Sequence, residues 1–300
     1  MIDDNYEVFT VKKDLQNGFS SHNQLCKLAS DLQQTTSTKV NIDFSKINFI
    51  AANLFSVLGC IFSEFNFRND NNLLRINGLK ASILDTAKKN GFCQHIGIKK
   101  IPDTDNSVIP YKRFLVDEII EYEHYLTRNL FTRKDLPQMS QEAKDSIRDS
   151  LLELFKNVKD HTTSKYVYTC GQYFPQSYML YFTIVDIGET IAHNVNEYHS
   201  MHNLPYPAYP LQWAMKSGNT TSITQTPRGI GLSLITKFVS LNQGAFFIIS
   251  ETETFEIQKN KERFLKLDYS FPGTVVTIGF NLHDDAIYYL SSETNNTIQF

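Results

Sequence analysis

The segment Asp149–Thr163 reads DSLLELFKNVKDHTT and is the most informative stretch of the chain. At about 100° per residue, its apolar side chains fall on one helical stripe. That stripe begins with Ile147 and continues through Leu151, Leu154, Phe155 and Val158. A neighbouring stripe carries Glu153, Asn157, Asp160 and His161. The pattern therefore predicts a helix whose apolar face packs on a sheet while its polar edge faces a cleft.

Glu153 and Asn157 are four residues apart, so they are neighbours on that polar edge. The amide oxygen of Asn is a neutral, hard ligand that suits Mg²⁺ held otherwise by phosphates and water. A Glu one turn away can orient or deprotonate an attacking water. Taken alone, the pattern favours a solvated helix flank, so its interpretation depends on the rest of the chain.

A second motif is VDIGETI at residues 185–191, which follows the strand-like run MLYFTIV. Asp186 is therefore expected at the end of a strand, with Gly188 in the turn that follows. A carboxylate accepts a hydrogen bond from an amino group such as the N6 group of adenine. A glycine two residues later lets the backbone approach a flat base.

A third motif is TPRGIGLSLI at residues 226–235, where Gly229 and Gly231 come just before an apolar helical pattern. Backbone N–H groups at a helix start bind phosphate, and the helix dipole favours its negative charge. A G-x-G pattern by itself is usually only a tight turn. Further on, FPGTVVTIGF at residues 271–280 predicts an apolar strand that begins near Thr274.

Taken in order, these segments resemble the GHKL ATPase superfamily, which includes gyrase B, sensor histidine kinases and the anti-sigma serine kinases. ELFKNVKDHT resembles its N box, VDIGETI and RGIGLSLI its two glycine boxes, and PGTVVTIGF its closing strand. The resemblance covers about residues 137–282. It implies an α/β sandwich of the Bergerat type, in which helices cover one face of a mixed sheet. ATP would lie there under a lid formed by residues 192–227.

The resemblance also implies roles for individual residues, with ATP and Mg²⁺ as cofactors. Asn157 would bind Mg²⁺, Asp186 would recognise the adenine amino group, and Glu153 takes the place of the catalytic base. Arg228 would contact phosphate, although a solvated Arg is an equal alternative. The other residues carried over to the nucleotide site are Asp160, His161, Gly188, Gly229, Ile230, Gly231, Leu232 and Thr274. Thr190 departs from the pattern, because it stands where the first glycine box usually has a second glycine.

Residues 41–59, NIDFSKINFIAANLFSVLG, resemble the central strand, loop and helix of STAS domains, the anti-anti-sigma fold. This resemblance covers roughly residues 5–100, and another small α/β domain remains the alternative. The family loop commonly reads Asp-Ser-Ser-Gly and carries a phosphorylated Ser. Here the loop reads Ala51-Ala52-Asn53-Leu54, so a phosphorylation switch is not expected.

The expected organisation has four parts. Residues 1–105 form the STAS-like α/β domain, and 106–140 form a helical linker that contains one helix over 113–131. Residues 141–285 form the ATP-binding domain, and 286–300 form a tail. Ser140 is expected to cap the helix that begins at Gln141. In the STAS-like domain, Gly91 is expected to end the helix whose apolar residues run from Leu79 to Ala87.

Composition excludes several classes of protein. The 300 residues include 29 Lys and Arg against 32 Asp and Glu, a balance that argues against a nucleic-acid partner. No run approaches the roughly 18–20 apolar residues that span a bilayer, so no membrane association is expected. The four cysteines are widely scattered and the N-terminus lacks a signal-peptide pattern, which predicts a reduced, cytoplasmic protein.

Three functions are compatible with these motifs. The first is an ATP-hydrolysing conformational switch that acts through protein–protein contacts. The second is an anti-sigma-type serine/threonine kinase that phosphorylates a partner. The third is a non-catalytic interaction module with a degenerate nucleotide site. All three imply a protein partner, and because members of the superfamily often dimerise, a second copy of the chain is one candidate for it.

Overall fold

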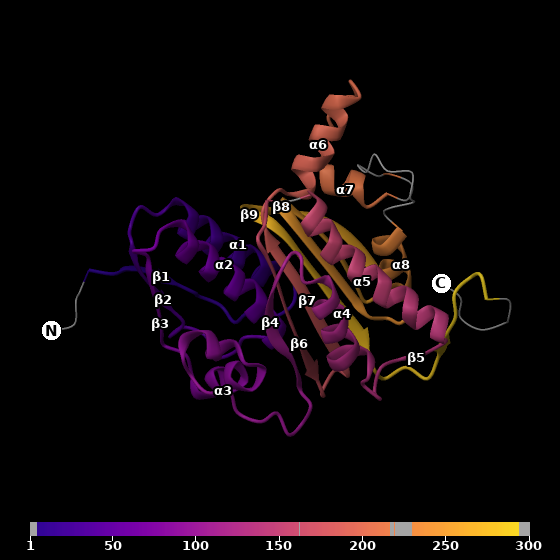
Figure 1. Cartoon of the computed structure of the whole chain (residues 1–300), viewed down its shortest axis with the longest axis horizontal. Coiled ribbons are helices and arrows are strands. Elements are labelled where there is room, and N and C mark those ends of the chain that lie inside the picture. The colour runs from indigo at the N-terminus through magenta and orange to yellow at the C-terminus, as the bar shows by residue number, and fades with distance from the viewer. Residues whose placement is uncertain (1–4, 162, 217–218, 220–229, 294–300) are drawn as a thin grey trace.

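The computed structural model of the chain describes residues 5–161, 163–216, 219 and 230–293, which form an α/β fold (Figure 1). Its N-terminal unit has a three-stranded parallel sheet in the order β1-β2-β3. The strands are β1 (Glu7–Thr10), β2 (Lys39–Asp43) and β3 (Leu73–Asn77). The helices are α1 (Phe19–Gln34), α2 (Phe55–Arg68) and α3 (Ala81–Asn90). Gly91 ends α3 in the left-handed conformation, as its sequence predicts.

The second unit is built on a five-stranded sheet in the order β4-β6-β7-β9-β8. Its strands are β4 (Val108–Leu115), β6 (Tyr166–Phe174), β7 (Met179–Ile187), β8 (Ala245–Gln258) and β9 (Lys261–Asn281). Every pairing in this sheet is antiparallel, so the expected mixed sheet is wrong. The apolar strand expected to begin near Thr274 is the last part of β9, which pairs with β8 along most of the length of both strands. Their pairing continues past a register shift at Glu251.

Helices of the second unit cover one face of this sheet (Figure 1). They are α4 (Ile119–Leu126), α5 (Gln141–His161) and α8 (Ile230–Leu241). The apolar stripe of α5 is buried there as predicted, with Leu151 and Phe155 fully enclosed. Ser140 caps α5, since its Oγ accepts a hydrogen bond from the N–H of Ala143 at 3.0 Å. Two shorter helices, α6 (Ile191–Met201) and α7 (Pro210–Ala214), project from the end of the sheet.

The opposite face of the same sheet is covered by α1 and α2 of the N-terminal unit. Leu25 and Cys60 share one hydrophobic core with Val185, Phe271 and Val275 of the sheet. The expectation of helices on one face is therefore incomplete, because the chain covers both faces. Strand β7 reads MLYFTIV without alternation, which is typical of a strand buried on both sides.

The seam between the units also contains buried polar groups. Asn53 is fully buried, and its Nδ2 donates to Thr183 Oγ1 at 2.9 Å. The Sγ of Cys170 donates to the carbonyl of Ala52 at 3.0 Å, and the N–H of Ala52 donates to Gln172 Oε1. The loop Ala51–Leu54, compared above with the STAS phosphorylation loop, is thus closed inside the molecule.

Two predictions about the connecting segments are wrong. The expected helical linker 106–140 begins with strand β4, which pairs with β6 at the edge of the large sheet. The expected helix 113–131 is shorter, since only α4 is regular and a π-helical turn, Thr127–Phe131, follows it. The expected tail, residues 286–300, contains regular structure, because β10 (Ile287–Tyr288) pairs with β5 (Gln138–Met139).

Removing residues 1–105 is expected to make the rest of the chain aggregate. The deletion would uncover an apolar sheet face that includes Tyr168, Val185, Phe271 and Val275, all buried in the complete chain. Size-exclusion chromatography of residues 106–300 checks this, with co-expression of residues 1–105 as the rescue control. A monodisperse fragment that unfolds cooperatively would show that the shared core is dispensable.

Within the described ranges, no helix combines the length and the apolar character that crossing a membrane requires.

Candidate functional site

A row of three polar side chains crosses the sheet where β7 ends. Asp186 on β7 lies opposite Thr274 on β9, and Thr274 lies opposite Ser250 on β8. Side chains alternate along a strand, and Phe182 and Ile184 of β7 lie in the core beneath α5 and α8. Asp186 therefore faces the α5 side of the sheet, as do Thr274 and Ser250.

Asp186 is the most unusual group in the row. It is 3% exposed, and its buried Oδ2 has no hydrogen-bond partner among the residues that the structure describes. Burial raises the pKa of Asp186 from 3.8 to about 8. A buried acceptor without a donor is costly in a folded protein and requires an explanation. A ligand N–H directed at this oxygen would supply the missing donor, so the arrangement suits the amino group of a purine.

The backbone beside Asp186 leaves no room for a side chain at position 273 of the neighbouring strand β9. Gly273 lies opposite Ile187, and a Cβ there would collide with the carbonyl oxygen of Asp186. The N–H of Gly188 donates to the carbonyl of Pro272 at 3.0 Å and fixes the turn after β7. Gly273 was singled out in the sequence only as part of the closing strand motif. Here it permits the close approach of β9 to the end of β7.

The polar edge of α5 lies at the same end of the sheet (Figure 1). Helix α5 ends at His161, five residues before β6 begins, and Tyr168 of β6 pairs with Val185, which precedes Asp186. Glu153 and Asn157 are half-buried on this helix, whereas Asp160 is exposed. The side chain of His161 lies outside what the structure describes. The fold thus brings the polar edge of α5 and the strand-end carboxylate of Asp186 to one end of the sheet.

Helix α6 begins directly at this row. Thr190 caps it, because its Oγ1 accepts from the N–H of His193 at 3.1 Å. The N–H of Ile191 donates to Ser250 Oγ at 2.9 Å. A capping role explains why Thr, a preferred N-cap residue, stands where the resembling family has a second glycine. Ser250 was not predicted, since its only signal in the sequence is that a polar residue ends the apolar run 245–249.

Part of the predicted site cannot be placed. Arg228 and Gly229 lie outside the described residues, as do 217–218 and 220–227 of the expected lid. Helix α8 begins at Ile230, so Gly231 lies within its first turn, whereas the sequence pattern predicted Gly231 just before the helix. Leu232 packs partly buried against the core beneath α5. The described part of the expected lid consists mainly of α6, α7 and the segment that joins them.

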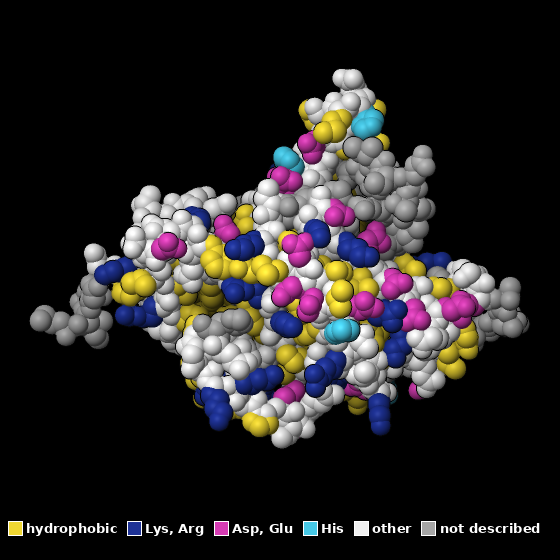
Figure 2. Space-filling model, viewed as in Figure 1, with side chains coloured by type: hydrophobic (Ala, Val, Ile, Leu, Met, Phe, Trp, Pro, Cys, Tyr) yellow, Lys and Arg dark blue, Asp and Glu magenta, His cyan; other side chains and the backbone are white. Residues whose placement is uncertain are grey.

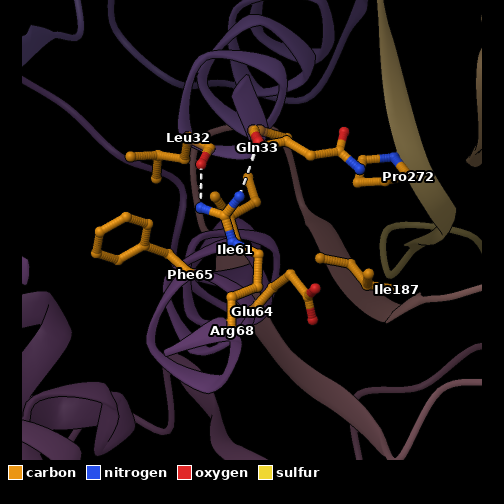
Figure 3. A pocket seen from close by; sticks show the side chains of 9 residues that line it. Leu32, Gln33, Ile61, Glu64, Phe65, Arg68, Ile187 and Pro272 are labelled. Carbon is orange, nitrogen blue, oxygen red and sulfur yellow. Dashed lines mark hydrogen bonds between the residues drawn. The ribbon is translucent and has the colours of Figure 1, made fainter. Parts of the chain in front are cut away.

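The N-terminal unit packs on the opposite face of the sheet, at the same ends of β7 and β9 that carry this site. Figure 3 shows Arg68 of α2 beneath the end of α1, where it donates to the carbonyls of Leu32 and Gln33. Ile187 and Pro272, which flank Asp186 and Gly273, line the same small pocket. Burial raises the pKa of the Cys60 thiol well above its usual value, and the negative charge of Asp186 contributes. The two units therefore meet at the residues that position Asp186.

Among the residues that the structure describes, no group of three or more His, Cys, Asp or Glu could hold a metal ion. Asn157 supplies one neutral oxygen from a half-buried position on α5. Such a ligand fits Mg²⁺ that keeps several waters and takes its other ligands from substrate phosphates.

No protein-family model matches the sequence, and no curated protein sequence matches it significantly.

Proposed function

We propose that the chain is a Mg-ATP-binding regulatory protein of the histidine-kinase-like ATPase superfamily and acts as an ATP-hydrolysing switch through protein–protein contacts. The observation that carries the proposal is the buried Oδ2 of Asp186, which lacks a donor within the described chain. The adenine N6 group would donate to it, and Thr274 on the neighbouring strand would lie beside the base. Guanine carries an oxygen at that position and would leave the carboxylate unsatisfied.

The other roles follow from α5 and α8. Asn157 would hold Mg²⁺, which when bound neutralises phosphate charge. The N–H groups at the start of α8, around Gly229 and Gly231, would bind phosphate oxygens. Glu153, one turn before Asn157, would orient the attacking water and accept its proton.

In this proposal the fold is a Bergerat-type unit fused to a STAS-like unit. An N-box helix on the same sheet face as Asp186 supports the first assignment, and the parallel β1-β2-β3 sheet supports the second. In anti-sigma systems these two folds are separate partners. The buried Asn53 loop makes their contact here a permanent one, which disfavours phosphorylation of that loop within the chain.

The arm formed by α6 and α7 is the element that nucleotide would move. Only residues 187–190 separate Asp186 from α6, and Ser250 ties the first N–H of α6 to the polar row. Binding that rearranges this row would therefore act directly on the arm. A ligand shifts such an equilibrium only as far as its affinities for the two states differ.

Calorimetric titration of the complete chain with ATP and with GTP, each at millimolar Mg²⁺, tests the proposal. We expect ATP to bind and GTP to bind at least about tenfold more weakly, because a buried acceptor would be left without its donor. Equal affinities, or no ATP binding, would contradict the role of Asp186. With γ-labelled ATP, release of free phosphate indicates an ATPase, and labelled protein indicates the kinase alternative.

Glu153→Ala is expected to leave ATP affinity within about twofold and to slow hydrolysis by about 10²–10⁴-fold, the usual contribution of a general base. Phosphate release under single-turnover conditions measures the effect. Asp149→Ala, which removes an exposed carboxylate from the same helix, is the matched control. Undiminished turnover in Glu153→Ala would show that another group activates the water.

A further inference from the structure

A second recess lies at the other end of the large sheet. It is an open hollow with a volume of about 480 Å³, bordered by the end of α3, the connector into β4 and the π-helical turn after α4. Val108 of β4 lines it and pairs with Gln172, whereas Asp186 lies near the level of Tyr168. Several rungs of the sheet therefore separate this recess from the proposed nucleotide site.

The charge of the recess is opposite in sign to that of the whole chain. It is lined by two carboxylates and by five cations, Lys89, Lys100, Arg128, Arg133 and Lys134, so the lining carries +3 while the chain carries −3. Figure 2 shows Lys and Arg side chains gathered on this part of the surface, near α3 and the lower end of α4.

Both carboxylates in the recess are already engaged. Asp103 accepts from Ser107 Oγ at 2.8 Å and from the N–H of Val108 at 2.9 Å. Asp135 accepts two hydrogen bonds from the Arg133 guanidinium, at 3.0 and 2.7 Å, and the carbonyl of Asn106 accepts a third at 2.9 Å. Lys89 pairs with Asp105 at 3.4 Å.

The remaining three cations give the recess its unbalanced charge. Within the described ranges, the structure records no ion pair for Lys100, Arg128 or Lys134. Three positive charges around one hollow repel one another, and a bound anion would relieve that repulsion.

The π-helical turn Thr127–Phe131 presents Arg128 to this recess. The N–H of Thr132 donates to the carbonyl of Thr127 at 3.0 Å, a bond that spans five residues. Side chains stabilise the turn, since Asn129 Nδ2 donates to the carbonyl of Tyr125 and Thr132 Oγ1 to that of Arg128. π-helical turns are rare and occur frequently at functional sites. This backbone feature is independent of the charge pattern and points to the same place.

We propose that this recess binds a small anion that carries a phosphate or diphosphate group, held by Lys100, Arg128 and Lys134. Its volume is in the range of small-molecule sites, and its polar, cationic lining suits a compact ligand with two or more negative charges. The ligand bridges the N-terminal unit, through the connector that carries Lys100, and the second unit, through the π-helical turn. This site is separate from the nucleotide site and does not depend on it.

The test is calorimetric titration of the complete chain with inorganic pyrophosphate, in EDTA at 50 mM NaCl, so that metal-dependent binding at Asn157 is suppressed. Orthophosphate is the second arm and is expected to bind more weakly because it carries less charge. The variant is K100Q/R128Q/K134Q. The matched control is K12Q/K46Q/K261Q, which removes the same charge from three exposed positions elsewhere.

Pyrophosphate should bind the native chain and the control equally, and the recess variant should lose about tenfold or more in affinity. Raising NaCl to 500 mM should weaken binding in the first two proteins. Amide chemical shifts should change at residues 128–132. Equal affinity in the two variants, absence of binding to the native chain, or shift changes confined to other segments would each overturn the proposal. A thermal melt of each variant verifies that it is folded.

Discussion

Asp186→Asn is expected to weaken ATP binding by about 10–100-fold, the range for losing a hydrogen bond to a charged acceptor. The replacement keeps the size of the side chain but exchanges one acceptor oxygen for an NH₂ donor, which opposes the adenine amino group. GTP affinity should change less. Calorimetry with both nucleotides measures the difference, and Asp268→Asn, at an exposed position on β9, is the control. Unchanged ATP affinity would remove Asp186 from the nucleotide site.

The same residue predicts how binding depends on pH. With a pKa of about 8, Asp186 is mostly protonated at pH 7 in the free protein, and an amino donor prefers the ionised form. ATP affinity should therefore rise as the pH increases from 6.5 towards 8 and then level off. In Asp186→Asn this dependence should disappear. A flat profile in the native chain would contradict a link between adenine binding and proton loss.

The free energy of unfolding should respond in the opposite direction. An Asp whose pKa is raised on folding stabilises the folded state while protonated, and this stability is lost as the pH rises from about 4 to about 8. The native chain should therefore become less stable over that interval, by several kcal/mol at most. Asp186→Asn removes the buried charge and should melt at a higher temperature than the native chain at pH 8.5. A buried group that lowers the stability of the fold is typical of a functional site.

Asn157→Ala is expected to abolish the part of ATP binding that requires Mg²⁺. In EDTA the variant and the native chain should bind ATP with the same weak affinity, because the amide acts only through the metal. Added Mg²⁺ should then strengthen binding by tenfold or more in the native chain alone. Titration with and without the metal measures this difference.

The control for Asn157→Ala is Lys156→Ala, which changes an exposed neighbour on α5. Alanine favours helices more than Asn does, so the variant should keep its fold and its melting temperature. A metal response in Asn157→Ala equal to that of the control would show that another group holds the ion.

Much of the local structure could be predicted from the residues. The apolar stripe of α5, its cap at Ser140 and the strand that ends at Asp186 are each local patterns, and all three are confirmed. Strand β4 was missed because Pro110 lies inside it. The structure places Pro110 at a register shift on an edge strand, where a residue without an N–H is tolerated.

The docking of the two units could not be predicted from local periodicity. The docking depends on which apolar surface of the N-terminal unit packs against which face of the large sheet. Here α1 and α2 pack against the face that carries Val185 and Val275. The lack of a donor for Asp186 Oδ2 among the described residues could not be predicted either, because segments distant in the sequence pack around this carboxylate. The π-helical turn also escaped prediction, since its residues TRNLF continue the helical pattern of α4.

The shared core has a consequence for synthesis on the ribosome. Helices α1 and α2 leave the exit tunnel early, but β9, which α1 packs against, ends only at Asn281. At a translation rate of about 5–20 residues per second, about 10–50 s pass between the synthesis of α1 and that of its partner strand. During that interval the nascent chain displays the surface that chaperones recognise. A slower ribosome would lengthen this exposure and should lower the yield of native protein.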